Sequence, residues 1–484
     1  MRLITRPTTT LAAAALAGVV AALAAPTALR AQSPRLPVGL ALDVPVRYDA
    51  DHLPPAFHRA RRDAVSAALP GDAVAIVLGG VEAGGAVDDL REFEQDPYLY
   101  YLTGTHEAGS ALVLVPGGVE VEGRRVREIL FVPPRDPGME IWLGRRFGPE
   151  RAEGALKVEL ALPYDRFGEI VGPLLARGER PAYLLPFPAA VPPSTQLAEQ
   201  IGVLADAAMS RTKALDDFTL TAILDGLREV KTDEEMALLR KAADITCAAL
   251  AESMRAMEPG WAEYEIEAVI EYTFRRMGSE RPGFPSIVGS GENALLLHYD
   301  TNRRTTRAGD LVVMDVGASY RGYTADVTRT VPVSGRFTPE QRAIYEIVLK
   351  AQEAAIAAVG AGVSFGAPGE AAARVLAAGL AQLGLLDGPD DFRGLRRFFP
   401  HGTSHYLGLQ VHDVGSYRAL DAGAVITVEP GIYIGPAEDI PSRWWNIGIR
   451  IEDDVLVTEG KPVVLTTGVP KDPDAIEALM SAGR

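Results

Sequence analysis

Cysteine is almost absent from the 484-residue chain, which contains only Cys247. A single cysteine excludes an intrachain disulfide. Cys247 lies in the pattern KAADITCAALAESM, whose apolar residues recur at helical spacing, so we expect its thiol to pack inside an amphipathic helix. The sequence also has no fixed-period repeat, and nothing indicates a repeat architecture.

Positive charge is scarce relative to negative charge. The chain has 48 lysines and arginines against 64 aspartates and glutamates, which gives a formal net charge of −16. An acidic protein is a poor ligand for nucleic acid or for an anionic membrane surface, and we expect neither as a partner. The hydrophobic fraction of 47% is typical of a globular protein, and the length allows two or three domains.

Long apolar runs are lacking except at the N-terminus. Two arginines precede the run Leu11–Ala25, which is followed by proline and small residues, a pattern typical of a secretory signal peptide. We expect residues 1–31 to be removed, with cleavage after Ala24 or Ala31, although an uncleaved anchor is an alternative. The mature protein would then be exported, to a bacterial periplasm or out of the cell, without membrane attachment. The scarcity of cysteine fits a periplasm.

Strand and helix patterns divide the remaining chain in two. Three short apolar runs predict buried strands separated by helical stretches, which indicates an α/β domain. These runs are residues 73–80, 111–116 and 128–134. After a proline-rich stretch a helical pattern resumes near residue 216, and Thr232 and Glu235 then have the spacing of a capping box. We therefore predict an N-terminal domain at 32–220 and a second domain at 221–484.

Histidine is also rare, yet three of the seven histidines fall within twelve residues of the segment PHGTSHYLGLQVHDVG. His401 and His405 are four residues apart, as in a helical zinc pair. The surrounding proline and glycines argue against a helix, and the glutamate of an HExxH motif is missing. We predict a loop whose three histidines, with His412 as the third, serve a common site, although structural histidines are the simpler alternative.

Two aspartates interrupt apolar, β-branched sequence in LVVMDVGASYRGYTADVTRT. The turn residues in its middle predict a hairpin. Because strand side chains alternate between faces, Asp315 and Asp326 can meet on paired strands. Aspartate is depleted in strands, which makes two ordinary solvated residues a weaker interpretation.

Two glutamates occupy similar positions further along. Glu429 lies in AVITVEPGIYI, a strand pattern that we expect Pro430 and Gly431 to end. Glu452 lies in NIGIRIEDDVLV, where one strand face is apolar and the other is charged. For the neighbouring Asp453 and Asp454 we expect ordinary solvation.

These segments supply four carboxylates and one imidazole in the order Asp315, Asp326, His405, Glu429 and Glu452. Burying them together would be costly unless a cation neutralised them. The set is too acidic for a typical structural zinc site, but it suits a pair of harder divalent ions sharing carboxylates. The sequence therefore predicts a two-metal hydrolase.

These motifs resemble those of the "pita-bread" metallopeptidases, and among them the Xaa-Pro aminopeptidase group. The segment LLLHYDTN at 295–302 is similar to that group's HYxxN motif, and FEQDPYLYYLTG and EIWLGRRFG are similar to its non-catalytic domain. The resemblance implies an α/β (α+β) protein with an N-terminal creatinase-type domain followed by a pita-bread catalytic domain. It also implies a homo-oligomer, either a dimer or a tetramer.

The resemblance further implies a dinuclear centre, usually of manganese, with cobalt or zinc as alternatives. Asp326 and Glu452 would bridge the ions, Asp315 would complete one ion, and the other would take the remaining two ligands, His405 and Glu429. The pocket would be lined by further side chains, namely His298, His401, His412 and Arg450.

The implied substrate is a peptide with proline second, from which the first residue is released. From the residue types we expect a metal-bridging hydroxide to attack the scissile carbonyl, with Glu429 as general acid/base. His412 would help to stabilise the oxyanion, and His298 and His401 would position the proline side or assist the leaving nitrogen. Arg450 would orient a carboxylate ligand through a bidentate contact, unless it forms an ordinary surface ion pair.

Three other interpretations remain open from the sequence. An Xaa-Pro dipeptidase (prolidase) would share the metal ligands but differ in the length of its substrate. A non-catalytic peptide-binding module on the same fold would be expected to lose ligands, and so would a metal-free relative such as creatinase. All five ligand positions are filled in this chain.

Overall fold

The computed structural model describes residues 49–81, 93–176, 180–187, 191–193, 195–210 and 215–482. The predicted signal peptide, residues 1–31, lies outside these ranges. Within them, no helix is both long and apolar enough to cross a membrane. Residues 135–146 belong to a compact unit separate from the one that contains the described residues of 47–134 and 147–484. The predicted domain division at residue 220 stays a prediction.

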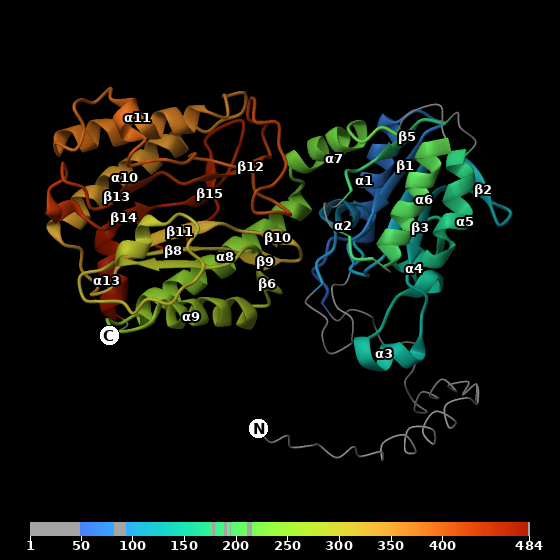
Figure 1. Cartoon of the computed structure of the whole chain (residues 1–484), viewed down its shortest axis with the longest axis horizontal. Coiled ribbons are helices and arrows are strands. Elements are labelled where there is room, and N and C mark those ends of the chain that lie inside the picture. The colour runs from blue at the N-terminus through green and yellow to red at the C-terminus, as the bar shows by residue number, and fades with distance from the viewer. Residues whose placement is uncertain are drawn as a thin grey trace, which may run out of the picture. The chain divides into compact units, whose positions relative to one another are not determined.

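The first part of the chain forms a mixed five-stranded sheet with the order β4-β3-β2-β1-β5 (Figure 1). Its strands are β1 (Val74–Leu78), β2 (Ala111–Val121), β3 (Arg124–Val132), β4 (Ala161–Pro163) and β5 (Ala182–Leu184). The pairings β1–β2 and β2–β3 are antiparallel, whereas β1–β5 and β3–β4 are parallel. The three strands predicted from apolar runs are therefore confirmed, because each run is buried in this sheet.

Helices accompany this sheet as the α/β prediction requires. They are α1 (Pro55–Ala68), α2 (Pro97–Thr103), α4 (Gly148–Leu156), α5 (Phe167–Ala176) and α6 (Gln196–Ser210). Phe167 of α5 stacks edge-on against Phe131 of β3, with ring centroids 5.2 Å apart, and both side chains are buried in the core. The separate unit contains α3 (Pro137–Leu143), which Asp136 caps through the amides of Gly138 and Met139.

The second part of the chain is richer in helix. Its helices are α7 (Thr219–Glu229), α8 (Asp233–Ala256), α9 (Glu263–Arg276), α10 (Pro339–Ala357), α11 (Ala367–Gln382), α12 (Phe392–Leu395) and α13 (Pro473–Ala482). The predicted capping box at Thr232 and Glu235 starts α8, and Cys247 is buried inside that helix as expected. Figure 1 shows the pairs α8–α9 and α10–α11 on opposite sides of the strands that hold the candidate site.

The strands between these helix pairs form short, separate sheets. They are β6 (Arg281–Pro282), β7 (Ile287–Ser290), β8 (Leu311–Val316), β9 (Ala318–Tyr320), β10 (Tyr323–Thr324), β11 (Val327–Pro332), β12 (Val425–Val428), β13 (Gly431–Ile434), β14 (Ile447–Arg450), β15 (Asp453–Leu456) and β16 (Val463–Val464). The predicted hairpin is present, because β8 pairs antiparallel with β11 and places Asp315 opposite Thr328. Its tip belongs to a separate three-stranded sheet, in which β9 pairs with both β10 and β6.

The predicted strand end is confirmed, because β12 ends at Val428, just before Glu429 and Pro430. The prediction did not include the next strand, since Gly431 begins β13 and pairs with Arg450 of β14. The chain breaks for only two residues and then resumes in a different sheet, since β12 pairs with β15 and β13 pairs with β14. This break is the feature that positions the site.

Candidate metal centre

Three of the carboxylates lie at breaks between strands. Asp326 precedes β11, Glu429 lies between β12 and β13, and Glu452 lies between β14 and β15. Their amides leave the regular ladders: the Asp326 amide donates to Asp454 Oδ1 (3.3 Å), the Glu429 amide to the carbonyl of Thr403 (2.9 Å), and the Glu452 amide to the carbonyl of Thr328 (3.1 Å). Each break is thereby tied to another segment, and the three side chains converge.

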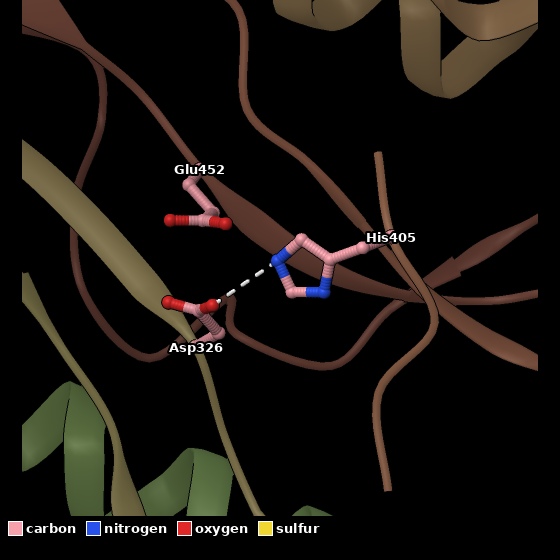
Figure 2. Close-up of side chains that lie close together, drawn as sticks. All are labelled: Asp326, His405 and Glu452. Carbon is pink, nitrogen blue, oxygen red and sulfur yellow. Dashed lines mark ion pairs between the residues drawn. The ribbon is translucent and has the colours of Figure 1, made fainter. Parts of the chain in front are cut away.

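Figure 2 shows how closely Asp326, His405 and Glu452 approach one another. Each offers one ligand atom, and these atoms lie within 4.8 Å of one another. His405 Nε2 lies 3.3 Å from Asp326 Oδ2 and 3.6 Å from Glu429 Oε1. His405 Nδ1 lies 3.0 Å from the carbonyl oxygen of Tyr406, which can only accept a hydrogen bond. Nδ1 therefore carries the proton, and the Nε2 lone pair faces the carboxylates as metal ligation requires.

Two carboxylate oxygens in this cluster are buried without a hydrogen-bond partner among the described residues. They are Asp315 Oδ1 and Asp326 Oδ1. Buried acceptors without partners are rare because each forfeits its hydration. A divalent cation satisfies such oxygens directly, and carboxylate-rich sets suit Mg²⁺ and Mn²⁺. The donor set therefore fits metal ions.

The pKa shifts of these residues also indicate that the cluster fits cations. Burial raises the pKa of Asp326 and of Glu452 well above the usual range, and the neighbouring carboxylates raise it further. Burial also raises the pKa of Glu429 to about 8 and lowers the pKa of His405 to about 4. These groups are crowded so that they resist being charged together, and cations would reverse that penalty.

Arg450 links the cluster to its surroundings from a buried position, with 3% of the residue exposed. Its guanidinium donates to Asp315 Oδ2 (2.5 Å), to the hydroxyl of Tyr433 (2.9 Å) and to Thr328 Oγ1 (3.1 Å). The alternative of a surface ion pair is therefore wrong. The contact with Asp315 uses one nitrogen, so the predicted bidentate geometry is absent. Thr328 in turn donates to Glu452 Oε2 at 2.7 Å.

The predicted pocket residues surround one cavity of about 230 Å³. It is lined by Leu297, His298, Asp315, His401, Gly402, Ser404, His405, His412, Glu429 and Arg450. His401 is held by two hydrogen bonds, since its Nδ1 lies 2.7 Å from the carbonyl of Gly402 and its Nε2 lies 2.9 Å from the Tyr433 hydroxyl. His412 packs edge-on against the His405 ring at 4.4 Å. The structure thus brings every predicted site residue together.

Sequence reasoning missed Tyr433. Its hydroxyl receives a hydrogen bond from Arg450 and faces His401 Nε2, so it connects two of the predicted residues. Burial raises its pKa to about 12, which keeps it protonated as a donor. The sequence did contain a signal for Tyr433, since it is a tyrosine inside the apolar strand GIYI and a buried hydroxyl needs a hydrogen-bond partner.

The expectation for Asp453 and Asp454 is wrong, because each is only 1% exposed. Asp453 accepts hydrogen bonds from Arg329 (2.7 Å) and Lys471 (2.6 Å), among others. The strand β15 lies inside a sheet, between β12 and β16, and α10 covers it with Gln352. The charge of Asp453 is therefore neutralised by a buried network rather than by water.

A second buried ion cluster was also missed. Asp413, next to His412, accepts from Arg228 Nη2 (2.5 Å) and from Lys231 Nζ (3.1 Å), and all three side chains are 1% exposed. Glu229, which lies between these two cations in the sequence, accepts hydrogen bonds from the hydroxyls of Tyr406 (2.8 Å) and Ser416 (2.9 Å). The end of α7 and the residues just after it therefore anchor the loop that carries His401, His405 and His412.

Two protein-family models match the chain. Residues 237–459 match metallopeptidase family M24, and residues 58–183 match the aminopeptidase P N-terminal domain. The chain is 37% identical over 454 residues to the Xaa-Pro aminopeptidase of Escherichia coli strain K12, an alignment that covers 88% of this chain and 98% of that protein.

Solved structures are similar along nearly the whole chain. A Pseudomonas aeruginosa aminopeptidase has a TM-score of 0.81 at 35% identity, covering 90% of this chain and 99% of that chain. A zinc-substituted Escherichia coli aminopeptidase P in complex with product has a TM-score of 0.82 at 34% identity, with the same coverage of 90% and 99%.

Proposed function

Since the chain belongs to metallopeptidase family M24 and is a metal-dependent exopeptidase of the Xaa-Pro aminopeptidase type, we propose that it releases the first residue from peptides with proline second. Its fold is the two-domain aminopeptidase P fold, an α/β domain followed by a pita-bread domain. The observation that carries the proposal is the meeting of Asp326, His405 and Glu452 in one buried cluster with orphaned carboxylate oxygens beside it.

We assign two divalent ions to this cluster. The residues that would hold these ions are Asp315, Asp326, His405, Glu429 and Glu452. Manganese is the proposed metal, because four of the five ligands are carboxylates. A relative has been solved with zinc substituted in it, so zinc and cobalt remain the comparisons to make.

The bound ions would act as Lewis acids that polarise the scissile carbonyl and activate water. Side chains of the protein would then transfer the protons and orient the substrate. Glu429 would accept a proton and pass it to the leaving nitrogen, and its position 3.6 Å from both His405 Nε2 and His401 Nδ1 supports this assignment. Because proline makes the scissile amide tertiary, that nitrogen has no hydrogen of its own and must receive one on cleavage.

The histidines and Arg450 would fix the geometry of these steps. Arg450 holds Asp315 by a short charge-assisted hydrogen bond, and through Tyr433 it also sets the ring of His401. His298 and His412 are exposed on the cavity wall, where they can bind polar groups of the substrate. We assign His412 to the developing oxyanion and His298 to the proline side.

The prolidase alternative is not favoured, because the relatives that align over the whole chain are named as aminopeptidases. We further propose that the protein is exported, with residues 1–31 as its signal peptide, and that it forms a homo-oligomer.

The test is metal reconstitution of the mature protein. After chelation, Mn²⁺, Co²⁺ or Zn²⁺ should restore release of the first residue from Xaa-Pro-Xaa tripeptides, but not from Xaa-Ala-Xaa controls. Asp326→Asn should bind less metal and lose activity, whereas Asp439→Asn, at an exposed ion pair with Arg397, should behave as the unaltered enzyme. Turnover of Xaa-Pro dipeptides alone would move the assignment to a dipeptidase. A fully metal-loaded protein without any turnover would contradict it.

A further inference from the structure

Two cavities meet at the candidate metal centre and share His298, Asp315 and His412. The first, described above, has polar walls that include His401, Glu429 and Arg450. The second measures about 250 Å³. Its wall is largely apolar, with Phe284, Pro285, Ile287 and Val411. A cavity of about 150 Å³ already admits a benzene-sized molecule, so the apolar cavity has room for an amino-acid side chain.

The two cavities can be assigned from the needs of the proposed reaction, on which this inference rests. The leaving nitrogen belongs to the proline and needs a proton donor within hydrogen-bond reach. Glu429 and His401 line only the polar cavity, so the proline and the rest of the peptide belong there. The side chain of the first residue is then left with the apolar cavity.

One charged residue outside the metal ligands lines this apolar cavity. Asp300 is exposed, and none of the described residues forms an ion pair or a hydrogen bond with its carboxylate. Its position is nevertheless fixed by its neighbours. The Tyr299 hydroxyl donates to Glu263 (2.8 Å), and the Asn302 amide group donates to the carbonyl of Ser286 (2.8 Å) and accepts from the Val288 amide (3.0 Å).

The charges around Asp300 leave an excess of negative charge. Glu267 and Glu271 lie on the adjacent helix α9. Burial raises the pKa of Glu267, and the charges of Glu271 and Asp300 raise it further. Glu271 also accepts a hydrogen bond from Ser286 (2.9 Å). The cation in this area, Arg303, lies over the ring of Tyr264, 5.3 Å from its centroid, rather than on Asp300. A ligand cation at the cavity would meet an uncompensated carboxylate.

We propose that Asp300 makes this cavity selective for a cationic first residue, so that the preferred substrates begin with Arg-Pro or Lys-Pro. The methylene stem of arginine or lysine packs along Phe284 and Ile287, as such stems do on apolar surfaces. Its charged head reaches the Asp300 carboxylate at the rim, where a charge-assisted hydrogen bond forms. An apolar first residue fills the same cavity but gains nothing from Asp300, and an acidic one is repelled.

The test compares Arg-Pro-Gly with citrulline-Pro-Gly, whose first side chains have nearly the same shape but differ in charge. The unaltered enzyme should show a kcat/KM about fivefold higher for the arginine peptide, the scale of a partly exposed ion pair. Asp300→Asn should bring this ratio to within twofold of one, by lowering kcat/KM for the arginine peptide more than for the citrulline peptide. Asp300→Glu should keep part of the preference, and added salt should weaken it.

Asp387→Asn is the matched control, because it removes the same charge from an exposed acid that lines neither cavity. An arginine-to-citrulline ratio that Asp300→Asn leaves unchanged would overturn the proposal. An equal loss of kcat/KM for both peptides would also overturn it, because Asp300 would then act on the substrate's amino terminus or on the position of the nearby His298.

Failure of the proposed function can be distinguished from failure of the Asp300 proposal, since the unaltered enzyme would then turn over no Xaa-Pro peptide. In that case calorimetric titration of the metal-loaded protein with free arginine and free citrulline still decides the charge preference. Tighter binding of arginine that Asp300→Asn abolishes supports the proposal, and equal binding of the two overturns it.

Discussion

Replacing Asp413 with alanine is expected to destabilise the second part of the protein by about 3 kcal/mol. The carboxylate is the counter-charge for two buried cations, Arg228 at 2.5 Å and Lys231 at 3.1 Å. Breaking a buried ion pair from one side costs about 3–5 kcal/mol, because the remaining charge stays dehydrated. The low end applies here, since Arg228 keeps a contact with Gln410 (3.2 Å) and lies 4.6 Å from the ring of Tyr98.

The assay is thermal unfolding of the metal-loaded protein, followed by calorimetry. For a domain of about 250 residues, a loss of 3 kcal/mol corresponds to a fall in Tm of roughly 6–12 °C. Asp439→Ala is the control, because its ion pair with Arg397 is exposed and its removal should leave Tm unchanged. An Asp413→Ala protein that melts with the unaltered one would refute the reasoning.

The same cluster allows a stricter test. Replacing all three charges together, as Arg228→Met, Lys231→Met and Asp413→Leu, removes the dehydrated ions rather than stranding them. Stability should then recover most of the loss seen with Asp413→Ala. The triple variant should not recover activity to the same extent as stability, because these contacts hold the loop that carries His405 and His412. Recovery of both together would show that the cluster serves stability alone.

Three further outcomes follow from the buried contacts around the metal centre. Arg450→Met should lower metal affinity and kcat/KM by about 10- to 100-fold, as loss of a group that orients a ligand does, and metal titration by calorimetry measures this directly. Tyr433→Phe should cost about 1–3 kcal/mol of stability, because the buried Nη1 of Arg450 loses its partner, and should reduce kcat more than KM because the His401 ring loses its partner. Burial raises the pKa of Asp453, but Arg329 and Lys471 more than offset this and hold it at about 2. That pKa is below the ordinary value of about 3.9, so the stabilisation that the Asp453 carboxylate contributes is complete above about pH 4 and is lost as the pH falls toward 2. The free energy of unfolding of Asp453→Asn, measured with denaturant, should therefore depend less on pH across this window than that of the unaltered protein.

The order of the ligands could be predicted because their chemistry stands out locally. Asp315 and Asp326 interrupt apolar strand sequence, where aspartate is unusual, and the three histidines crowd one loop rich in glycine. The capping box at the start of α8 and the buried Cys247 were also readable, because each depends on a few neighbouring residues. Local patterns of this kind require no knowledge of which strands pair.

The partners of those ligands could not be predicted for the opposite reason. Arg450 reaches Asp315 across 135 residues, and Asp413 reaches Arg228 across 185. Asp453 was expected to be solvated because it stands between Glu452 and Asp454, and the sequence alone does not show that a buried Arg329 neutralises it. The end of the strand at Glu429 could be predicted from Pro430 and Gly431, but the new strand in another sheet could not, because proline and glycine have the same pattern whether or not a strand follows.

The breaks explain how like charges can be held together at all. Within a continuous ladder, side chains alternate strictly, and a carboxylate on one strand can meet few others. At Asp326, Glu429 and Glu452 the ladder stops, and each amide bonds to a different segment instead. These backbone contacts hold the three carboxylates near His405. The fold therefore sets the repulsion among them, and bound cations would relieve it.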